Sequence, residues 1–198
     1  GGDSGIGAAV AIAFAREGAD VAISYLPEEE EDAQRIAGLI REAGVQALTL
    51  PGDLKDSGYC REIVRSTVET FGGLDILVNN GGKQIYSEDI ADLSDEQFDH
   101  TFKTNVYAMF WLTKAAVEHM PPGSTIINTT SIQAYSPSDV LIDYASTKAT
   151  INAFTKGIAQ QLAPKGIRAN AVAPGPIWTV LQPTDGQPPE KIENFGKD

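Results

Sequence analysis

Alternation between helix-like and strand-like segments is the feature that most limits the folds open to this chain. Ile6, Val10, Ala13 and Phe14 recur at helical spacing within the first of five predicted helices, which cover 5–18, 28–43, 56–71, 94–119 and 143–163. Short apolar runs typical of strands buried on both faces lie at 20–25, 45–50, 74–78, 125–128 and 167–172. This order predicts an α/β fold with a doubly wound parallel sheet, formed by residues 1–198 as a single domain.

Charge and composition exclude several classes of protein. Fifteen basic and 27 acidic residues give a net charge of −12, which argues against non-specific binding to nucleic acid or to an anionic membrane. No apolar run approaches the roughly 20 residues that a membrane helix needs. The single cysteine, Cys60, fits a reducing compartment, and the two histidines form no zinc-like pattern with it. We therefore expect a cytoplasmic protein without a metal.

A glycine-rich stretch, Gly1-Gly2-Asp3-Ser4-Gly5-Ile6-Gly7, leads directly into the first predicted helix. Glycines let the backbone approach a ligand closely, and a helix N-terminus offers free N–H groups and a positive dipole end to a pyrophosphate. The spacing G-x-x-x-G-x-G differs from the common dinucleotide fingerprint, G-x-G-x-x-G. Taken alone, it is equally typical of a glycine-rich turn before a helix.

A second pattern joins a tyrosine, a lysine and a serine. Tyr144 and Lys148 are four residues apart in a predicted helix, so they share one face, and a nearby cation would lower the phenol pKa from about 10. Ser131 follows the strand at 125–128, at the sheet edge where ligands of such folds bind. An isolated Tyr-x-x-x-Lys is more commonly a surface pair, and Ser131 alone could simply cap the strand.

Taken together, five motifs in this order resemble the short-chain dehydrogenase/reductase family. They are the glycines at 1, 5 and 7; Asp53-Leu54; Asn79-Asn80-Gly81-Gly82; Ser131 with Tyr144-x-x-x-Lys148; and Pro174-Gly175. The similarity covers nearly the whole chain and is greatest for a bacterial subgroup acting on aldehydes or glucose-like alcohols. Gly81 stands where the family usually has alanine.

The resemblance implies a Rossmann-like sheet whose first strand, together with a C-terminal helix and strand, is not found in residues 1–198. That first strand would lie in the middle of the sheet. We therefore expect an excerpt of a longer protein with an unfilled central slot, and we expect these 198 residues not to fold cleanly alone.

The resemblance also assigns roles to individual residues. Tyr144 would act as the acid–base group, Lys148 would lower its pKa and bind the nicotinamide ribose, and Ser131 would polarise the substrate carbonyl. Asn105, an unfavourable residue inside a helix, resembles the family asparagine that holds a water in a proton relay. The implied coenzyme-binding residues are Gly1, Ser4, Gly5, Ile6, Gly7, Tyr25, Asp53, Leu54, Asn80, Gly81, Lys148, Pro174, Gly175, Ile177 and Thr179.

The expected function is that of an oxidoreductase transferring a hydride between NAD(P)(H) and an aldehyde, a ketone or a sugar-like alcohol. The alternatives are a dinucleotide-binding or scaffold protein without turnover, and an epimerase or dehydratase of the same fold. Ser24, Tyr25 and Leu26 end the predicted strand without an acid that would exclude a 2′-phosphate, which slightly favours NADP over NAD, although no basic residue stands there to bind it.

The predicted partners are a small-molecule substrate and further copies of the chain. Gln133, Tyr135, Trp111 and Trp178 are candidates for the substrate pocket, although Trp111 is more typical of a core. By resemblance, the helices at about 94–119 and 143–163 would pack into a homotetramer or a dimer.

Overall fold

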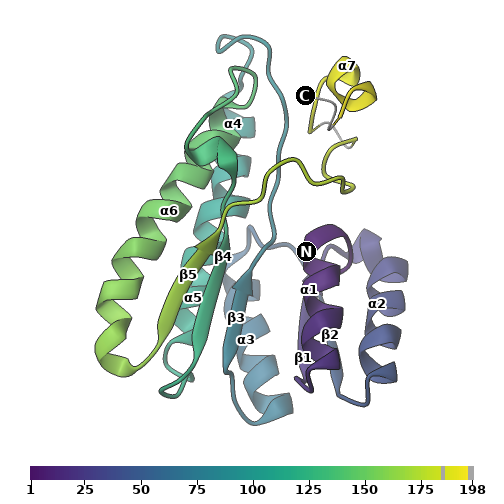
Figure 1. The fold of residues 1–198 in the computed structure, drawn as a ribbon, viewed down its shortest axis with the longest axis vertical. Helices are drawn as coiled ribbons and strands as arrows, with labels where there is room; N and C mark the ends of the chain where they lie inside the picture. Colours follow the sequence, from purple (N-terminus) through teal and green to yellow (C-terminus); the bar gives the residue numbers. More distant parts are fainter. Residues whose placement is uncertain (184–185, 196–198) are drawn as a thin grey trace.

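The computed structural model describes residues 1–183 and 186–195, and within them five parallel strands form two sheets (Figure 1). One sheet pairs β1 (Val21–Tyr25) with β2 (Ala47–Pro51). The other has the order β3 (Ile76–Asn79), β4 (Thr125–Thr129) and β5 (Arg168–Val172). The predicted parallel α/β fold is therefore confirmed, with strand bounds within two residues of those expected.

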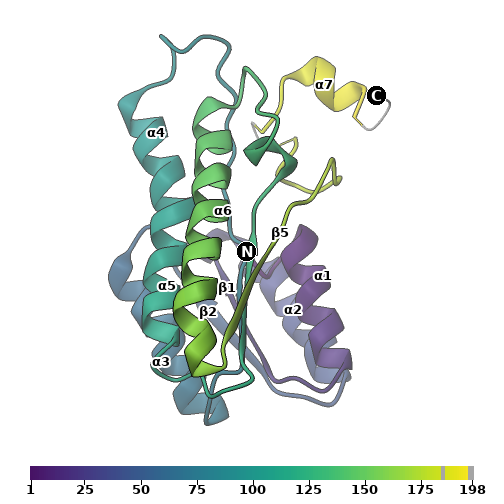
Figure 2. The ribbon, with the colours of Figure 1, turned by 60° about the vertical axis from the view of Figure 1, so that its left-hand side comes forward.

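Helices cover both faces of the sheets. The helices α1 (Gly5–Arg16) and α2 (Glu30–Glu42) lie on one side. On the other side lie α3 (Ser57–Phe71), α5 (Ala108–Ala116) and α6 (Ile142–Leu162), as the turned view shows (Figure 2). This arrangement on both faces leaves the carboxyl ends of all five strands free at one edge.

The long predicted helix at 94–119 is interrupted. It begins as α4 (Asp95–Phe102), where the Ser94 hydroxyl accepts a hydrogen bond from the backbone N–H of Gln97, as the capping spacing predicts. A π-helical turn, Lys103–Tyr107, then precedes α5. Single π turns inside α-helices are frequent at functional sites, and Asn105 is buried in this one.

The hydrophobic core is divided like the sheets. One cluster joins α1, α2 and β1 through residues such as Ile23, Ile36 and Ile40. The other joins α3, α5 and the three-stranded sheet through residues such as Val64, Leu112 and Ile126. The half built on β1 and β2 and the half built on β3, β4 and β5 therefore each bury their own apolar residues.

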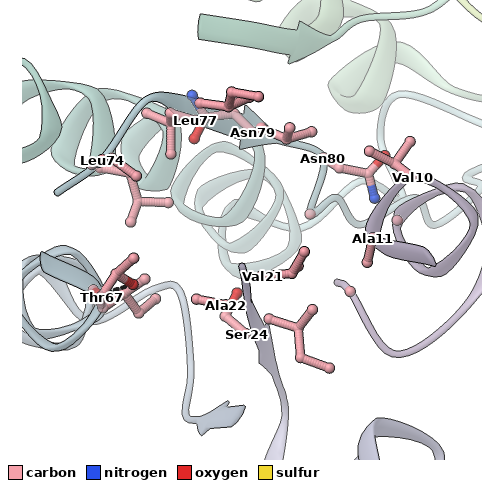
Figure 3. Close-up of a pocket in the computed structure, with 18 of the residues that line it drawn as sticks. Val10, Ala11, Val21, Ala22, Ser24, Thr67, Leu74, Leu77, Asn79 and Asn80 are labelled. Carbon is pink, nitrogen blue, oxygen red and sulfur yellow. Dashed lines mark hydrogen bonds between the residues drawn. The ribbon is translucent and has the colours of Figure 1, made fainter. Parts of the chain in front are cut away.

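A cavity of about 670 Å³ lies between the two halves, bordered by β1 and by β3 (Figure 3). Its wall is mainly aliphatic, with Val10 and Ala11 from α1, Val21 and Ala22 from β1, and Leu77 from β3. Among the described residues, β1 pairs only with β2, and β3 only with β4. This is the slot expected from the family resemblance, and it separates the edge of β1 from the edge of β3.

The chain after β5 is rich in proline, a composition that predicts a loop. It is irregular from Pro174 to Pro183, but it then forms a short helix, α7 (Pro189–Glu193), since a proline fits the first turn of a helix. Figure 1 shows this tail lying beyond the N-terminal end of α1. None of the helices within the described residues is long and apolar enough to span a membrane.

Candidate active site

A second cavity, of about 730 Å³, lies at the carboxyl ends of the strands. It is lined by every predicted site residue except two: Gly1, Ser4, Gly5, Ile6, Tyr25, Asp53, Leu54, Asn80, Gly81, Ser131, Tyr144, Lys148, Pro174, Gly175, Ile177 and Thr179. The exceptions, Gly7 and Asn105, border the cavity between the sheets instead. Segments distant in sequence thus meet where parallel α/β folds bind ligands.

The glycine loop has no room for side chains. A Cβ at Gly7 would lie 1.8 Å from the Gly1 carbonyl oxygen, and Gly5 has a φ of +51°, in the left-handed region. The Gly1 carbonyl also accepts a hydrogen bond from Asn80 Nδ2 at 3.2 Å, which ties the loop to the end of β3. The chain enters α1 through Ser4, whose side chain makes no capping bond. The first-turn N–H groups of α1 therefore suit a phosphate ligand, and the loop fits a dinucleotide.

Gly81, which stands where the family usually has alanine, lies against Leu54, and both residues line the cavity. A Cβ at this position would lie 2.7 Å from Leu54 Cδ1, the end of a flexible side chain that can move aside. The packing therefore leaves room for alanine once Leu54 adjusts.

Two predicted coenzyme contacts are already engaged with protein groups. The Tyr25 hydroxyl donates to Glu30 Oε2 at 2.7 Å, and the residue is only 3% exposed, although it lines the cavity. Glu30 reaches the hydroxyl because a helix follows β1. The Asp53 carboxylate pairs with Lys55 Nζ at 3.2 Å and accepts from the Lys55 N–H at 2.9 Å. At this end, the wall also includes Glu28 and Glu29.

Tyr144 lies in the first turn of α6 and faces Ser131 across the cavity wall. The Ser131 side chain accepts a hydrogen bond from the Gln133 N–H at 3.2 Å, so it caps the short 3₁₀ turn Ile132–Ala134. Burial raises the pKa of Tyr144, and the neighbouring Ser131 side chain offsets part of that rise. The direction expected for this pKa was therefore wrong, because burial of the phenol is the largest cause of the shift.

Lys148 stands one helical turn beyond Tyr144, on the same face of α6, as predicted. Its ammonium lies 5.4 Å from the centre of the Tyr144 ring and donates to the Thr129 carbonyl oxygen at 2.8 Å. Burial lowers the pKa of this lysine to about 8. The ammonium is therefore held between the end of β4 and the phenol.

The carboxylate of Asp143, which sequence reasoning overlooked, holds the start of α6. One oxygen accepts from the Tyr144 N–H at 2.7 Å, and the other accepts from Thr101 Oγ1 at the same distance. Asp143 is 1% exposed. It therefore fixes the first turn of α6, and with it Tyr144, against α4.

The Asn105 side chain forms hydrogen bonds with two neighbouring residues. Its oxygen accepts from the Lys83 N–H at 2.7 Å, and its amide group donates to the Lys83 carbonyl at 2.9 Å and to Thr147 Oγ1 at 3.0 Å. A Cβ at Gly82 would lie 3.5 Å from Asn105 Oδ1 and 3.6 Å from Lys148 Nζ, so the glycine separates the two groups. Asn105 therefore holds the segment after β3, which includes Gly82 and Lys83, beside Lys148.

The substrate pocket was predicted only in part. Gln133 lines the cavity, but Tyr135 and Trp178 are 70% and 60% exposed and do not line it. The Trp178 ring contacts Phe195 instead. Trp111 packs against the core cluster, which agrees with the core interpretation of this residue.

Comparisons with known proteins agree with this geometry. A family model described as enoyl-(acyl carrier protein) reductase matches residues 1–197. The uncharacterised oxidoreductase YghA of Escherichia coli K12 is 57% identical over 197 residues, covering 100% of this chain and 67% of the relative. The chain belongs to the short-chain dehydrogenase/reductase family.

Other members of the short-chain dehydrogenase/reductase family are similar along the whole chain. The chloroplastic NADPH-dependent aldehyde reductase 1 of Arabidopsis thaliana is 45% identical over 203 residues, covering 100% of this chain and 69% of that protein. The crystal structure of a short-chain dehydrogenase from Burkholderia cenocepacia J2315 in complex with NADP has a TM-score of 0.89 and 39% identity, covering 94% of this chain and 76% of that one. The chain thus spans about two thirds of the length of the curated relatives named here.

The cavity residues of this short-chain dehydrogenase/reductase that were missed from the sequence include Gln84, Gln182 and Gln187. Gln84 follows the Asn-Asn-Gly-Gly motif by two residues, so its place in the chain is a usable signal. The other two lie in the proline-rich tail, where no periodicity indicates which side chains face inward. Only the fold of the tail over the cavity reveals them.

Proposed function

We propose that the full protein is an NAD(P)-dependent oxidoreductase that interconverts a carbonyl and an alcohol, with an aldehyde, a ketone or a sugar-like alcohol as substrate. One observation carries the proposal: Tyr144, Ser131 and Lys148 line the same cavity as the glycine-rich loop. When bound, a nicotinamide coenzyme supplies or accepts the hydride. We assign this chemistry to one Rossmann-like domain, residues 1–198.

The protein groups divide the remaining work. In carbonyl reduction, the Tyr144 hydroxyl donates a proton to the substrate oxygen, and its raised pKa keeps it protonated at neutral pH. The Ser131 hydroxyl donates a hydrogen bond to the same oxygen as negative charge develops there. Lys148, beside the ring, stabilises the phenolate that is left. Asn105 holds the segment after β3, and a water beside that segment would pass a proton from solvent back toward Tyr144.

The experiment that tests this function is a titration of the full-length protein with NADH and NADPH, followed by a screen of aldehydes, ketones and polyols. We expect micromolar coenzyme binding and coenzyme-dependent turnover of at least one carbonyl compound. Tight coenzyme binding without turnover across the screen would instead support the binding or scaffold alternative.

We propose NADP(H) as the preferred coenzyme. The named Burkholderia and Arabidopsis relatives, described with NADP and NADPH, support this preference.

Glu28, however, lines the cavity near Tyr25, where its carboxylate would repel a 2′-phosphate. We therefore expect Glu28→Gln to lower the Kd for NADPH about threefold and to leave that for NADH unchanged, as measured by fluorescence titration at low salt. Glu31→Gln, exposed on α2 and outside the cavity, is the matched control. An equal change in both Kd values would remove Glu28 from coenzyme selection.

We also propose a cytoplasmic homo-oligomer, a tetramer or a dimer, formed through the helices α4, α5 and α6. Aromatic side chains on this face support the proposal, because Tyr107 and Phe110 are 46% and 44% exposed and Phe110 contacts Phe154 of α6 edge-on. Sedimentation equilibrium of the full-length protein measures the assembly directly.

A further inference from the structure

The backbone of Tyr144 is held at both of its polar groups by buried side chains of α6. Its N–H donates to Asp143 Oδ1 at 2.7 Å, and its carbonyl oxygen accepts from Thr147 Oγ1 at 2.6 Å. Asp143 and Thr147 are 1% and 0% exposed, and neither lines the cavity that Tyr144 borders. Any effect of these two residues on the reaction therefore passes through Tyr144.

The bond to Asp143 supplies an acceptor that the start of a helix lacks. Tyr144 lies in the first turn of α6, where backbone N–H groups have no acceptor within the helix. Leu141, which precedes the helix, offers no side-chain hydrogen bond to that turn. The Asp143 carboxylate accepts from the Tyr144 amide instead, so the position of Tyr144 depends on where this carboxylate is held.

Both side chains are in turn held by the interrupted helix that packs against α6. Asp143 Oδ2 accepts from Thr101 Oγ1 of α4 at 2.7 Å. Thr147 Oγ1 accepts from Asn105 Nδ2 of the π turn at 3.0 Å. Thr101 and Asn105 are themselves buried, with 0% and 2% of their surface exposed. The segment 101–105 therefore reaches the backbone of Tyr144 through two separate hydrogen-bonded links.

A buried carboxylate is an unfavourable group for this place unless it has a role. Burying a charge costs free energy, and apolar residues of similar volume commonly stabilise such positions better. Among the described residues, no lysine or arginine forms an ion pair with Asp143. Hydrogen-bond donors surround the carboxylate instead, including Gln97 Nε2 at 3.4 Å. This arrangement favours a role in placing Tyr144 over a role in stability alone.

We infer that Asp143 and Thr147 are positioning residues of the reaction, which hold the Tyr144 phenol in its place beside Lys148. The inference rests on the proposed function and adds two residues to the groups it uses. Misplacement of a reacting group by about 1 Å can cost about 100-fold in rate. Releasing either backbone group of Tyr144 should therefore lower kcat and leave coenzyme binding intact.

The helix α6 offers a matched pair of threonines for the test. Thr155 is buried like Thr147, accepts from Asn128 Nδ2 at 2.9 Å and donates to the Ile151 carbonyl oxygen at 2.7 Å. It lies about two turns farther along the helix and does not line the cavity. Thr147→Val and Thr155→Val thus delete the same hydroxyl and the same two kinds of hydrogen bond, but only Thr147→Val releases Tyr144.

The measurements use the full-length protein with the best substrate of the screen. Thr147→Val should lower kcat at least tenfold, while KM and the Kd for NADPH stay within twofold of wild type. Thr147→Ser, which keeps the hydroxyl, should restore kcat to within threefold of wild type. Thr155→Val should keep the wild-type kcat. An equal loss of kcat in the two valine variants, or no loss in Thr147→Val, would overturn the positioning role of Thr147.

A second pair of variants tests Asp143. Asp143→Asn keeps an oxygen that accepts from the Tyr144 N–H, whereas Asp143→Ala keeps none. We expect kcat within fivefold of wild type for the asparagine variant and at least tenfold lower for the alanine variant. Asp139→Ala, exposed before α6 and outside the cavity, is the control and should not change kcat. Equal losses in both Asp143 variants would remove Asp143 from the positioning role.

Amide hydrogen exchange separates this inference from the proposed function, because it needs no turnover. The Tyr144 amide, followed by NMR, should exchange at least tenfold faster in Asp143→Ala than in wild type and should keep the wild-type rate in Asp139→Ala. Absence of turnover with every carbonyl compound would overturn the oxidoreductase, and the exchange rates would then still decide whether Asp143 holds Tyr144. An unchanged rate in Asp143→Ala would overturn that link whatever the activity.

Discussion

Tyr144→Phe in the full-length protein is expected to lower kcat at least 100-fold while the Kd for NADPH stays within twofold of wild type. General acid catalysis by a positioned side chain contributes about 10²–10⁴-fold, and phenylalanine removes only the hydroxyl that supplies it. The ring itself is 7% exposed and packs at the start of α6, so the variant should keep its fold. Steady-state kinetics with the best substrate of the screen and a fluorescence titration provide the two measurements.

The matched control is Tyr135→Phe. Tyr135 is 70% exposed, lies outside the cavity, and loses the same hydroxyl without touching the proposed chemistry. Its kcat should equal that of wild type. Full activity in Tyr144→Phe would show that another group transfers the proton, and the acid–base role would have to be withdrawn from this residue.

Lys148→Met should lower kcat/KM by at least 100-fold, because it removes the only ammonium beside the phenol among the described residues and the proposed ribose contact. Methionine keeps the length and most of the apolar volume of the lysine stem. Lys156→Met, exposed on the same helix, is the control and should leave kcat/KM unchanged. Activity within fivefold of wild type in Lys148→Met would contradict the role.

The same variant has a second, pH-dependent signature. The folded chain lowers the pKa of Lys148 to about 8, whereas an unfolded lysine titrates near 10.4. Between these values, the unfolded state binds more protons, so the free energy of unfolding of wild type should rise with pH relative to Lys148→Met. Below pH 8, the difference between the two proteins should be constant. Urea unfolding of both proteins without coenzyme at pH 7, 8, 9 and 10 measures it, and parallel curves throughout would contradict the buried ammonium.

Sequence patterns predicted the order and bounds of the strands well, because short, continuous apolar runs alternating with helical segments are typical of parallel strands covered on both faces. They also placed most of the coenzyme loop and the Tyr144–Lys148 pair in one cavity, since both lie at element ends that a parallel sheet brings together. The π turn around Asn105 was not predictable, because its single extra residue leaves the apolar periodicity almost unchanged.

Electrostatic details could not be read from spacing. The direction of the Tyr144 pKa shift depends on how completely the phenol is shielded from water, which the Tyr-x-x-x-Lys pattern does not indicate. The same holds for Tyr25, whose hydroxyl is captured by Glu30 only because the following 3₁₀ turn and α2 fold back over β1.

The short contacts around Asn80 have a consequence for mutagenesis at the sheet edge. Its side-chain amide donates to the Gly1 carbonyl at 3.2 Å, and its side-chain oxygen accepts from the Thr129 hydroxyl at 3.2 Å. Lys148 donates to the carbonyl of the same threonine at 2.8 Å. A substitution at Asn80 should therefore disturb the glycine loop and the surroundings of Lys148 together.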